Sequence, residues 1–132
     1  MYLEVNNNLI TDNNKQIYVF DSVKNTWTAP NVTGTFAPIR KRELGVVMDD
    51  LGKMYVFGGL SDPTTGSNIA TLYNDMMIFD SNQLTWTRTS PANPPTLRAD
   101  FTATYLPKNK LIVYIGGRLG DGSDVNINEV AG

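Results

Sequence analysis

The amino-acid sequence predicts an all-β fold made of repeated units, each with four short antiparallel strands. The first observation is an internal repeat, because Thr26-Trp27-Thr28 returns as Thr85-Trp86-Thr87 after 59 residues. The second is that the apolar runs are short and rich in aromatic and β-branched residues, which is typical of strands. The third is that no stretch has the apolar period of about 3.6 residues that a helix requires.

Three further markers repeat with nearly the same spacing of 58 or 59 residues. One is an apolar strand that ends in aromatic-Asp, another is a single arginine, and the third is a strand that ends in Gly-Gly. The three pairs are 17–21 with 76–80, Arg40 with Arg98, and 54–59 with 112–117. Agreement between four markers indicates a true structural repeat.

One complete unit lies in the middle of the chain. Its predicted strands are 44–48, 53–57, 76–79 and 84–88. The first two strands are separated by the turn sequence Asp49-Asp50-Leu51-Gly52, and the second ends at Gly58-Gly59. A long polar loop follows. Asp80 opens the turn between the last two strands, and Asp21 has the same place in the other copy, so we expect both carboxylates to bind their own turn.

Half a unit lies on each side of the complete one. Strands three and four of a unit are predicted within 17–29, and strands one and two within 101–115. We therefore expect one repeat domain over residues 1–132. Its parts are a half-unit at 1–30, a complete unit at 38–90 and a complementary half-unit at 96–132.

The order of the markers resembles the kelch repeat, whose units are the blades of a β-propeller. It runs as arginine, strand, strand ending in Gly-Gly, loop with Asn-Asp, strand ending in aromatic-Asp, and tryptophan, and the copy from Arg40 to Trp86 has every marker. The resemblance covers nearly the whole chain. One departure is that Phe20 and Phe79 stand where the family usually has tyrosine. We expect Trp27 and Trp86 to be buried between blades.

The blades in this chain are too few to close a propeller, which needs about four to eight. The complementary half-blades predict head-to-tail association with further copies, which would also cover free strand edges. Three such chains would supply about six blades and four would supply about eight. We therefore expect a homo-oligomer, a trimer or tetramer. The alternative is that the sequence is an excerpt of a longer chain.

The composition excludes several kinds of active site. The chain has neither cysteine nor histidine, so it holds no disulfide, thiolate nucleophile, Cys/His zinc site or imidazole base. Kelch propellers include galactose-oxidase-like enzymes, whose copper site uses histidine, tyrosine and a modified cysteine. This chain has no residue for the histidine and cysteine roles. Asp121-Gly122-Ser123-Asp124 resembles half of a calcium loop, but no glutamate closes it. We expect no enzyme activity, no cofactor and no metal.

The only dense charge cluster is Arg40-Lys41-Arg42, at the start of the complete blade. Arg98 has the same phase as Arg40, whereas Lys41 and Arg42 have no basic counterpart in the other copy. Together with Arg118 they lie in the loops 38–43, 61–73, 90–100 and 118–128, which would share one face of a propeller. We expect Lys41, Arg42 and Arg118 to be unpaired cations. The predicted partner-binding residues are Arg40, Lys41, Arg42, Arg98 and Arg118.

The sequence thus predicts a non-enzymatic protein-interaction module that completes its propeller by self-association and binds an acidic protein segment through loops on one face. The alternatives are an excerpt of a galactose-oxidase-like enzyme and a carbohydrate-binding propeller. A net charge of −2 gives no reason to expect nucleic acid or anionic membrane as a partner. The chain has no apolar run of membrane-span length and no secretory signal, so we expect a cytoplasmic location.

Overall fold

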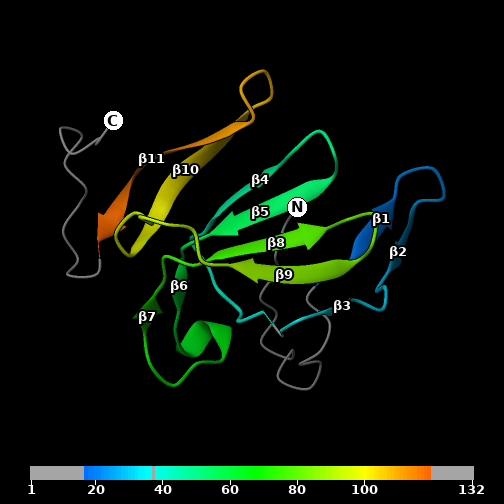
Figure 1. Ribbon diagram of the computed structural model, residues 1–132. Coiled ribbons are helices and arrows are strands. Elements are labelled where there is room, and N and C mark those ends of the chain that lie inside the picture. The colour runs from blue at the N-terminus through cyan, green and yellow to red at the C-terminus, as the bar shows by residue number, and fades with distance from the viewer. Residues whose placement is uncertain (1–16, 37, 120–132) are drawn as a thin grey trace.

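A computed structural model describes residues 17–36 and 38–119 (Figure 1). The described part of the chain forms β-strands and one short 3₁₀ helix, so the expected all-β fold is confirmed. No helix among these residues is long and apolar enough to span a bilayer.

The largest sheet has the strand order β3-β9-β8-β5-β4. Its strands are β3 (Thr33–Gly34), β4 (Gly45–Met48), β5 (Lys53–Phe57), β8 (Met76–Asp80) and β9 (Thr85–Thr89). Strands β4, β5, β8 and β9 pair antiparallel and lie where the sequence predicts the complete blade, within one residue at each end. The short β3 adds a parallel edge beside β9 that the sequence did not predict. The division of the chain at 1–30, 38–90 and 96–132 stays a prediction.

Two separate hairpins flank this sheet, one from each half of the repeat. They are β1 (Val19–Asp21) with β2 (Thr26–Thr28), and β10 (Arg98–Leu106) with β11 (Leu111–Leu119). The first hairpin reproduces β8 and β9 in detail. Phe20 lies opposite Trp27 with 4.9 Å between ring centroids, and Phe79 lies opposite Trp86 with 5.0 Å. The sequence repeat is therefore a repeat of strand register and side-chain packing.

The turns of the two copies are held by the same carboxylate. Asp21 Oδ1 accepts hydrogen bonds from the backbone N–H groups of Val23 and Lys24, both at 2.9 Å. Asp80 Oδ1 accepts the equivalent bonds at 2.9 and 3.0 Å. These bonds hold the turn and lower the pKa of Asp21. The predicted role of both aspartates is confirmed.

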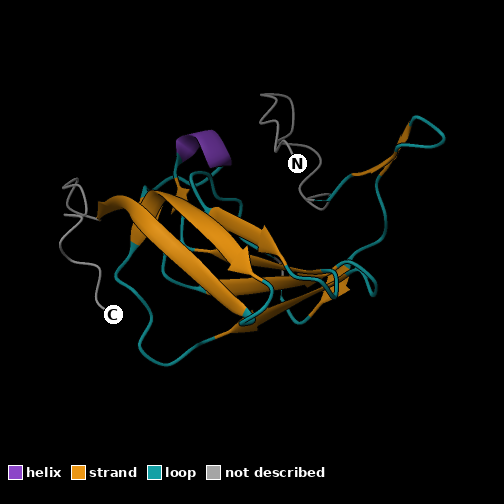
Figure 2. Cartoon of the chain, turned by 90° about the horizontal axis from the view of Figure 1, so that it is seen from above, coloured by secondary structure: helices purple, strands orange, loops and turns teal. Residues whose placement is uncertain are grey.

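The core covers one face of the sheet, where side chains alternate inward along each strand. Its buried members are Ile17, Met54, Val56, Met77, Phe79 and Trp86. Val32 and Phe36, from the segment around β3, pack against this cluster. Trp86 is 6% exposed, as predicted. The same prediction is wrong for Trp27, which is 68% exposed, because the β1–β2 hairpin projects from the sheet (Figure 2).

The β10–β11 hairpin packs on the other face of the sheet, beside β4 and β5 (Figure 1). The rings of Phe57, Phe101 and Tyr114 meet there at centroid distances of 5.0 to 5.8 Å. A Cβ at Gly45 would come within 2.3 Å of the Phe101 ring, so glycine allows this close approach. The Tyr114 hydroxyl is buried with no partner among the described residues, and burial raises its pKa to about 12. Tyr114 is therefore a packing residue.

Candidate functional site

Backbone hydrogen bonds gather three loops at one end of the sheet. Arg42 and Leu60 exchange bonds of 2.9 and 3.0 Å, and the Gly59 N–H donates to the Arg98 carbonyl at 3.0 Å. The Tyr73 N–H donates to the Gly59 carbonyl, also at 3.0 Å. We call this surface the loop face and define it as residues 38–44, 58–75, 96–100 and 116–119. In Figure 1 it contains β6 (Leu60–Ser61), β7 (Thr71–Leu72) and the adjoining ends of β10 and β11.

Glycines make the close approach between these loops possible. Gly58 and Gly59 have positive φ angles of 63° and 88°, a region that favours glycine. A Cβ on Gly58 would lie 2.9 Å from the Arg98 carbonyl oxygen. Gly116 and Gly117 repeat the positive φ at the corresponding place in β11. The Gly-Gly marker thus provides a turn that allows close packing.

Lys41 lies under the loop face, and its side chain is fully buried at 0% exposure. Its ammonium forms an ion pair with Asp75, donates to the Gly58 carbonyl at 3.2 Å and lies 4.4 Å from the centroid of the Tyr73 ring. Burial lowers the pKa of Lys41, and the Asp75 carboxylate opposes that effect. The expectation that Lys41 is an unpaired cation is wrong, since Asp75 and Tyr73 enclose it.

Arg42 pairs with the carboxylate that begins the 3₁₀ helix η2 (Pro63–Thr65). Its Nε and Nη2 lie 2.9 and 2.6 Å from Asp62 Oδ2. Asp62 Oδ1 accepts from the Thr64 backbone N–H and from the Thr64 hydroxyl, at 2.9 and 2.6 Å. Arg42 and then Thr64 lower the pKa of Asp62 to about 2. Asp62 therefore fixes both the helix cap and the orientation of Arg42.

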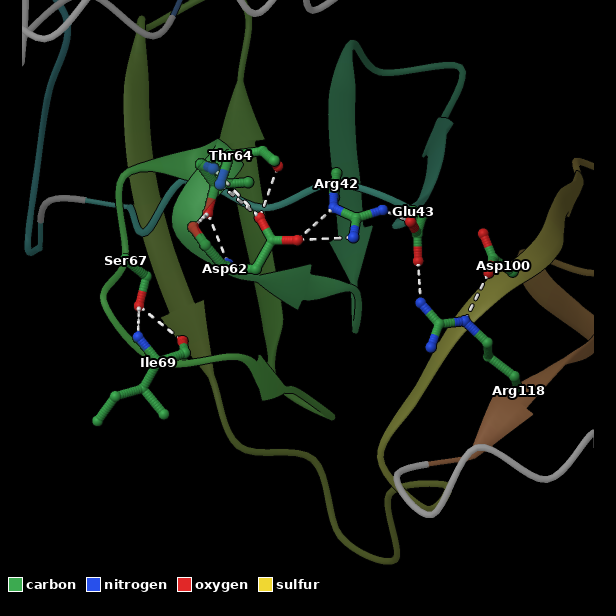
Figure 3. A network of polar contacts seen from close by, with 9 residues as sticks. Arg42, Glu43, Asp62, Thr64, Ser67, Ile69, Asp100 and Arg118 are labelled. Carbon is green, nitrogen blue, oxygen red and sulfur yellow. Dashed lines mark hydrogen bonds and ion pairs between the residues drawn. The ribbon is translucent and has the colours of Figure 1, made fainter.

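The same network continues to the β10–β11 hairpin (Figure 3). Glu43 contacts Arg42 on one side and lies 2.5 Å from Arg118 Nη2 on the other. Arg118 Nε also lies 2.8 Å from Asp100 Oδ2. Arg42 and Arg118 are thus paired, contrary to the expectation, although their side chains remain 40% and 34% exposed. The alternation of charges joins the central sheet to the hairpin.

Arg98 differs from its neighbours in the kind of oxygen it contacts. Its guanidinium donates to the Thr96 carbonyl at 3.2 Å, the Thr96 hydroxyl at 3.1 Å and the Gly116 carbonyl at 3.4 Å. Within 17–36 and 38–119 it forms no ion pair with a carboxylate. Arg98 is partly exposed, and the described part of the chain supplies no fixed counter-charge for it. Arg40, in the 38–44 segment of the same face, is also partly exposed.

The sequence did not predict the acidic half of this site. Its members are Glu43, Asp62, Asp75 and Asp100. One signal was present, because Asp75 belongs to the Asn-Asp marker of the repeat and proves to be the partner of Lys41. The site residues predicted from the sequence lie at one end of the sheet. Lys41, Arg42 and Arg118 form ion pairs there, whereas Arg98 contacts neutral oxygens. Their binding of a partner stays a prediction.

The described residues hold no group of three or more His, Cys, Asp or Glu side chains that could bind a metal ion. Asp49 and Asp50 serve contacts within and between strands. Asp49 accepts from the backbone of its own turn, and Asp50 contacts Tyr105 and Lys110 of the neighbouring hairpin. The half calcium loop at 121–124 lies outside the described residues.

Comparison with known proteins agrees with the repeat. The family model of the KLHDC2/KLHL20/DRC7 Kelch-repeats domain matches residues 6–131. Kelch domain-containing protein 3 of Rattus norvegicus and of Mus musculus is 29% identical over 103 residues, and that of Bos taurus is 31% identical over 104 residues. Each alignment covers 77% of this chain and 25% of the relative. The chain spans about a quarter of the length of these curated relatives.

Kelch repeats generally serve as protein-interaction modules that bind protein partners. The family match covers nearly all of the sequence, and the strands carry the Gly-Gly, aromatic-Asp and tryptophan markers at the places the repeat requires. The chain therefore belongs to the kelch-repeat family.

Proposed function

We propose that this chain holds an acidic segment of a protein partner on the loop face. The observation that carries the proposal is the environment of Arg98. Its partly exposed guanidinium contacts neutral oxygens alone among the described residues, so a carboxylate from outside would gain a charge-assisted hydrogen bond without displacing an existing ion pair.

The neighbouring cations have different parts in this proposal. Arg42 and Arg118 are already oriented by Asp62, Glu43 and Asp100, and their exposed edges would extend the site on one side of Arg98. Arg40 would contribute from the 38–44 segment. Lys41 is buried and would position the loops without touching the partner. Loops that present such groups on a rigid sheet are a common setting for recognition.

Binding of a fluorescent glutamate-rich peptide tests the proposal, with a glutamine-rich peptide of the same length as the reference. Arg98→Glu should abolish binding of the acidic peptide, and added salt should weaken binding to the unaltered protein. Lys110→Glu is the matched control, because Lys110 is an exposed cation at the opposite end of the β10–β11 hairpin. Equal affinity for both peptides, or equal loss in both variants, would refute the proposal.

We also propose that copies of the chain associate into a ring of three or four. The supporting observation is the apolar surface on the two hairpins that flank the sheet. Its exposed residues are Val19, Phe20 and Trp27 on β1 and β2, and Leu106, Leu111, Val113 and Ile115 on β10 and β11. Exposed patches of this kind mark interaction surfaces or aggregation-prone edges.

Dilution tests the association without any variant. Because subunit binding stabilises the folded state by mass action, the melting temperature should fall as the protein is diluted through the micromolar range. A melting temperature independent of concentration would contradict self-association.

A further inference from the structure

Strands β1 and β11 each have a free edge among the described residues, and they are complementary members of the repeat. Within the central sheet, β5 pairs with β4 on one side and with β8 on the other. Among the described residues, β11 pairs with β10 alone and β1 pairs with β2 alone. By the repeat, β11 is the copy of β5 and β1 is the copy of β8. Each strand therefore lacks the neighbour that the other can supply.

The central sheet supplies the register for such a pairing. In the β5–β8 ladder, Tyr55 lies opposite Ile78. Their copies are Val113 in β11 and Val19 in β1. We propose, on the basis of the proposed self-association, that β1 of one copy adds antiparallel to β11 of a second copy with Val19 opposite Val113. The result would be a four-stranded blade in the order β2-β1-β11-β10, matching β9-β8-β5-β4.

The side chains at this edge fit the pairing. Val19 and Val113 are both exposed in the single chain, and a β-branched pair is favourable directly across an antiparallel ladder. Phe20 and Trp27 are exposed as well, whereas their copies Phe79 and Trp86 are buried in the complete sheet. Addition of β1 to β11 would place Phe20 and Trp27 in a sheet of the kind that buries their copies.

The turns beside the strands repeat the same complementarity. In the complete blade, the Ser81 backbone N–H and hydroxyl donate to the Gly52 carbonyl at 3.0 and 2.7 Å. Ser22 is the copy of Ser81, and Lys110 precedes β11 as Gly52 precedes β5. In the proposed register, Ser22 of one copy would donate to the Lys110 carbonyl of the other. The turns at this end of the β1–β11 ladder would then be joined by the same kind of hydrogen bonds that join the turns beside the β5–β8 ladder.

The added strand would come from another copy, because the two hairpins of one chain lie apart. Figure 1 and Figure 2 place β1–β2 beyond one end of the central sheet and β10–β11 against β4. In this proposal the partner of the surface is a second copy of the chain, arranged head to tail. Such a contact leaves each copy one free edge to offer in turn, until a ring closes.

Disulfide trapping tests the register, since the natural chain has no cysteine to interfere. The full chain with Val19→Cys and one affinity tag is co-expressed with the full chain carrying Val113→Cys and a second tag. Directly opposite residues in an antiparallel ladder are within disulfide reach. Oxidation should shift most of the doubly purified protein to a covalent dimer. The control replaces Val113→Cys by Leu111→Cys, a more exposed thiol that would lie diagonally and out of reach.

A dimer band with Val113→Cys that is much stronger than with Leu111→Cys supports the proposal. Equal bands, or none, in a protein that light scattering shows to be oligomeric would overturn this register and leave self-association standing. A monomer by light scattering would overturn both, and would point to further blades on a different stretch of polypeptide as the occupant of these edges.

Discussion

Lys41 and Asp75 form a buried ion pair although 34 residues separate them in the chain. The pair joins the segment before β4 to the segment before β8, and the Tyr73 ring lies beside the ammonium. Asp75 also lies 3.2 Å from Arg88 of β9. A cation that looks like part of a solvated Arg-Lys-Arg cluster in the sequence is in fact what holds the loop face to the sheet.

Replacing Lys41 by methionine should therefore destabilise the fold. Without Lys41, the Asp75 carboxylate stays partly desolvated and loses its buried partner, which should cost about 3 kcal/mol of unfolding free energy. This value is at the lower end of the range for buried ion pairs because Arg88 still pairs with Asp75. Urea unfolding of Lys41→Met measures the loss. Lys24→Met is the matched control, because Lys24 pairs with Asp21 on the surface and should unfold like the natural chain. Equal unfolding midpoints for the two variants would contradict the assigned role.

The two tryptophans of the repeat should respond differently to truncation. Trp86→Ala removes a buried ring from the core and should cost about 3–5 kcal/mol of unfolding free energy at any protein concentration. Trp27→Ala removes an exposed ring and should leave a dilute sample unchanged, while lowering the melting temperature of a concentrated, associated sample. Thermal unfolding at two concentrations separates the effects. A loss for Trp27→Ala that is the same at both concentrations would show that the ring packs within its own chain.

Most strands of the central sheet could be predicted from the sequence, and the features that could not be predicted have physical causes. The strands of the central sheet follow from short apolar runs closed by Gly-Gly or by an aspartate turn, which are local signals. Strand β3 was missed because two residues, Thr33 and Gly34, show no alternation. Trp27 and Trp86 have the same local sequence, and each packs on a phenylalanine of its own hairpin. The burial of each tryptophan depends instead on which residues lie against that hairpin. The burial of Lys41 depends on Asp75, a contact that only the folded chain creates.

The decrease in the free energy of unfolding at acidic pH should depend on Asp62. Its folded pKa of about 2 lies below the usual 3.8, so its ionised form stabilises the fold fully above pH 3.8. That contribution is lost as pH falls through 3.8 toward 2. Asp62→Asn keeps a helix-capping side chain but no charge, and it should be less stable than the natural chain near pH 6, with the gap closing toward pH 2. Urea titrations across this range measure the gap, and a constant gap would exclude the ion pair as its source.

Gly58 and Gly66 separate the cost of close packing from that of backbone conformation. Both have positive φ, so alanine should cost roughly 1–2 kcal/mol at either position for conformation alone. At Gly58 the new Cβ would also meet the Arg98 carbonyl at 2.9 Å, whereas at Gly66 nothing lies within 4 Å. Gly58→Ala should therefore be the less stable variant in chemical unfolding. Equal stability would mean that the loop face does not need this approach.

The proposed self-association requires this kelch-repeat chain to complete its blades with copies of itself. Static light scattering on the purified full chain, coupled to size-exclusion chromatography, tests it most directly. A ring of copies should give a single species with the mass of three or four chains, and Trp27→Ala should shift the distribution toward smaller species. A well-folded monomer at micromolar concentration, with high strand content by circular dichroism, would contradict it.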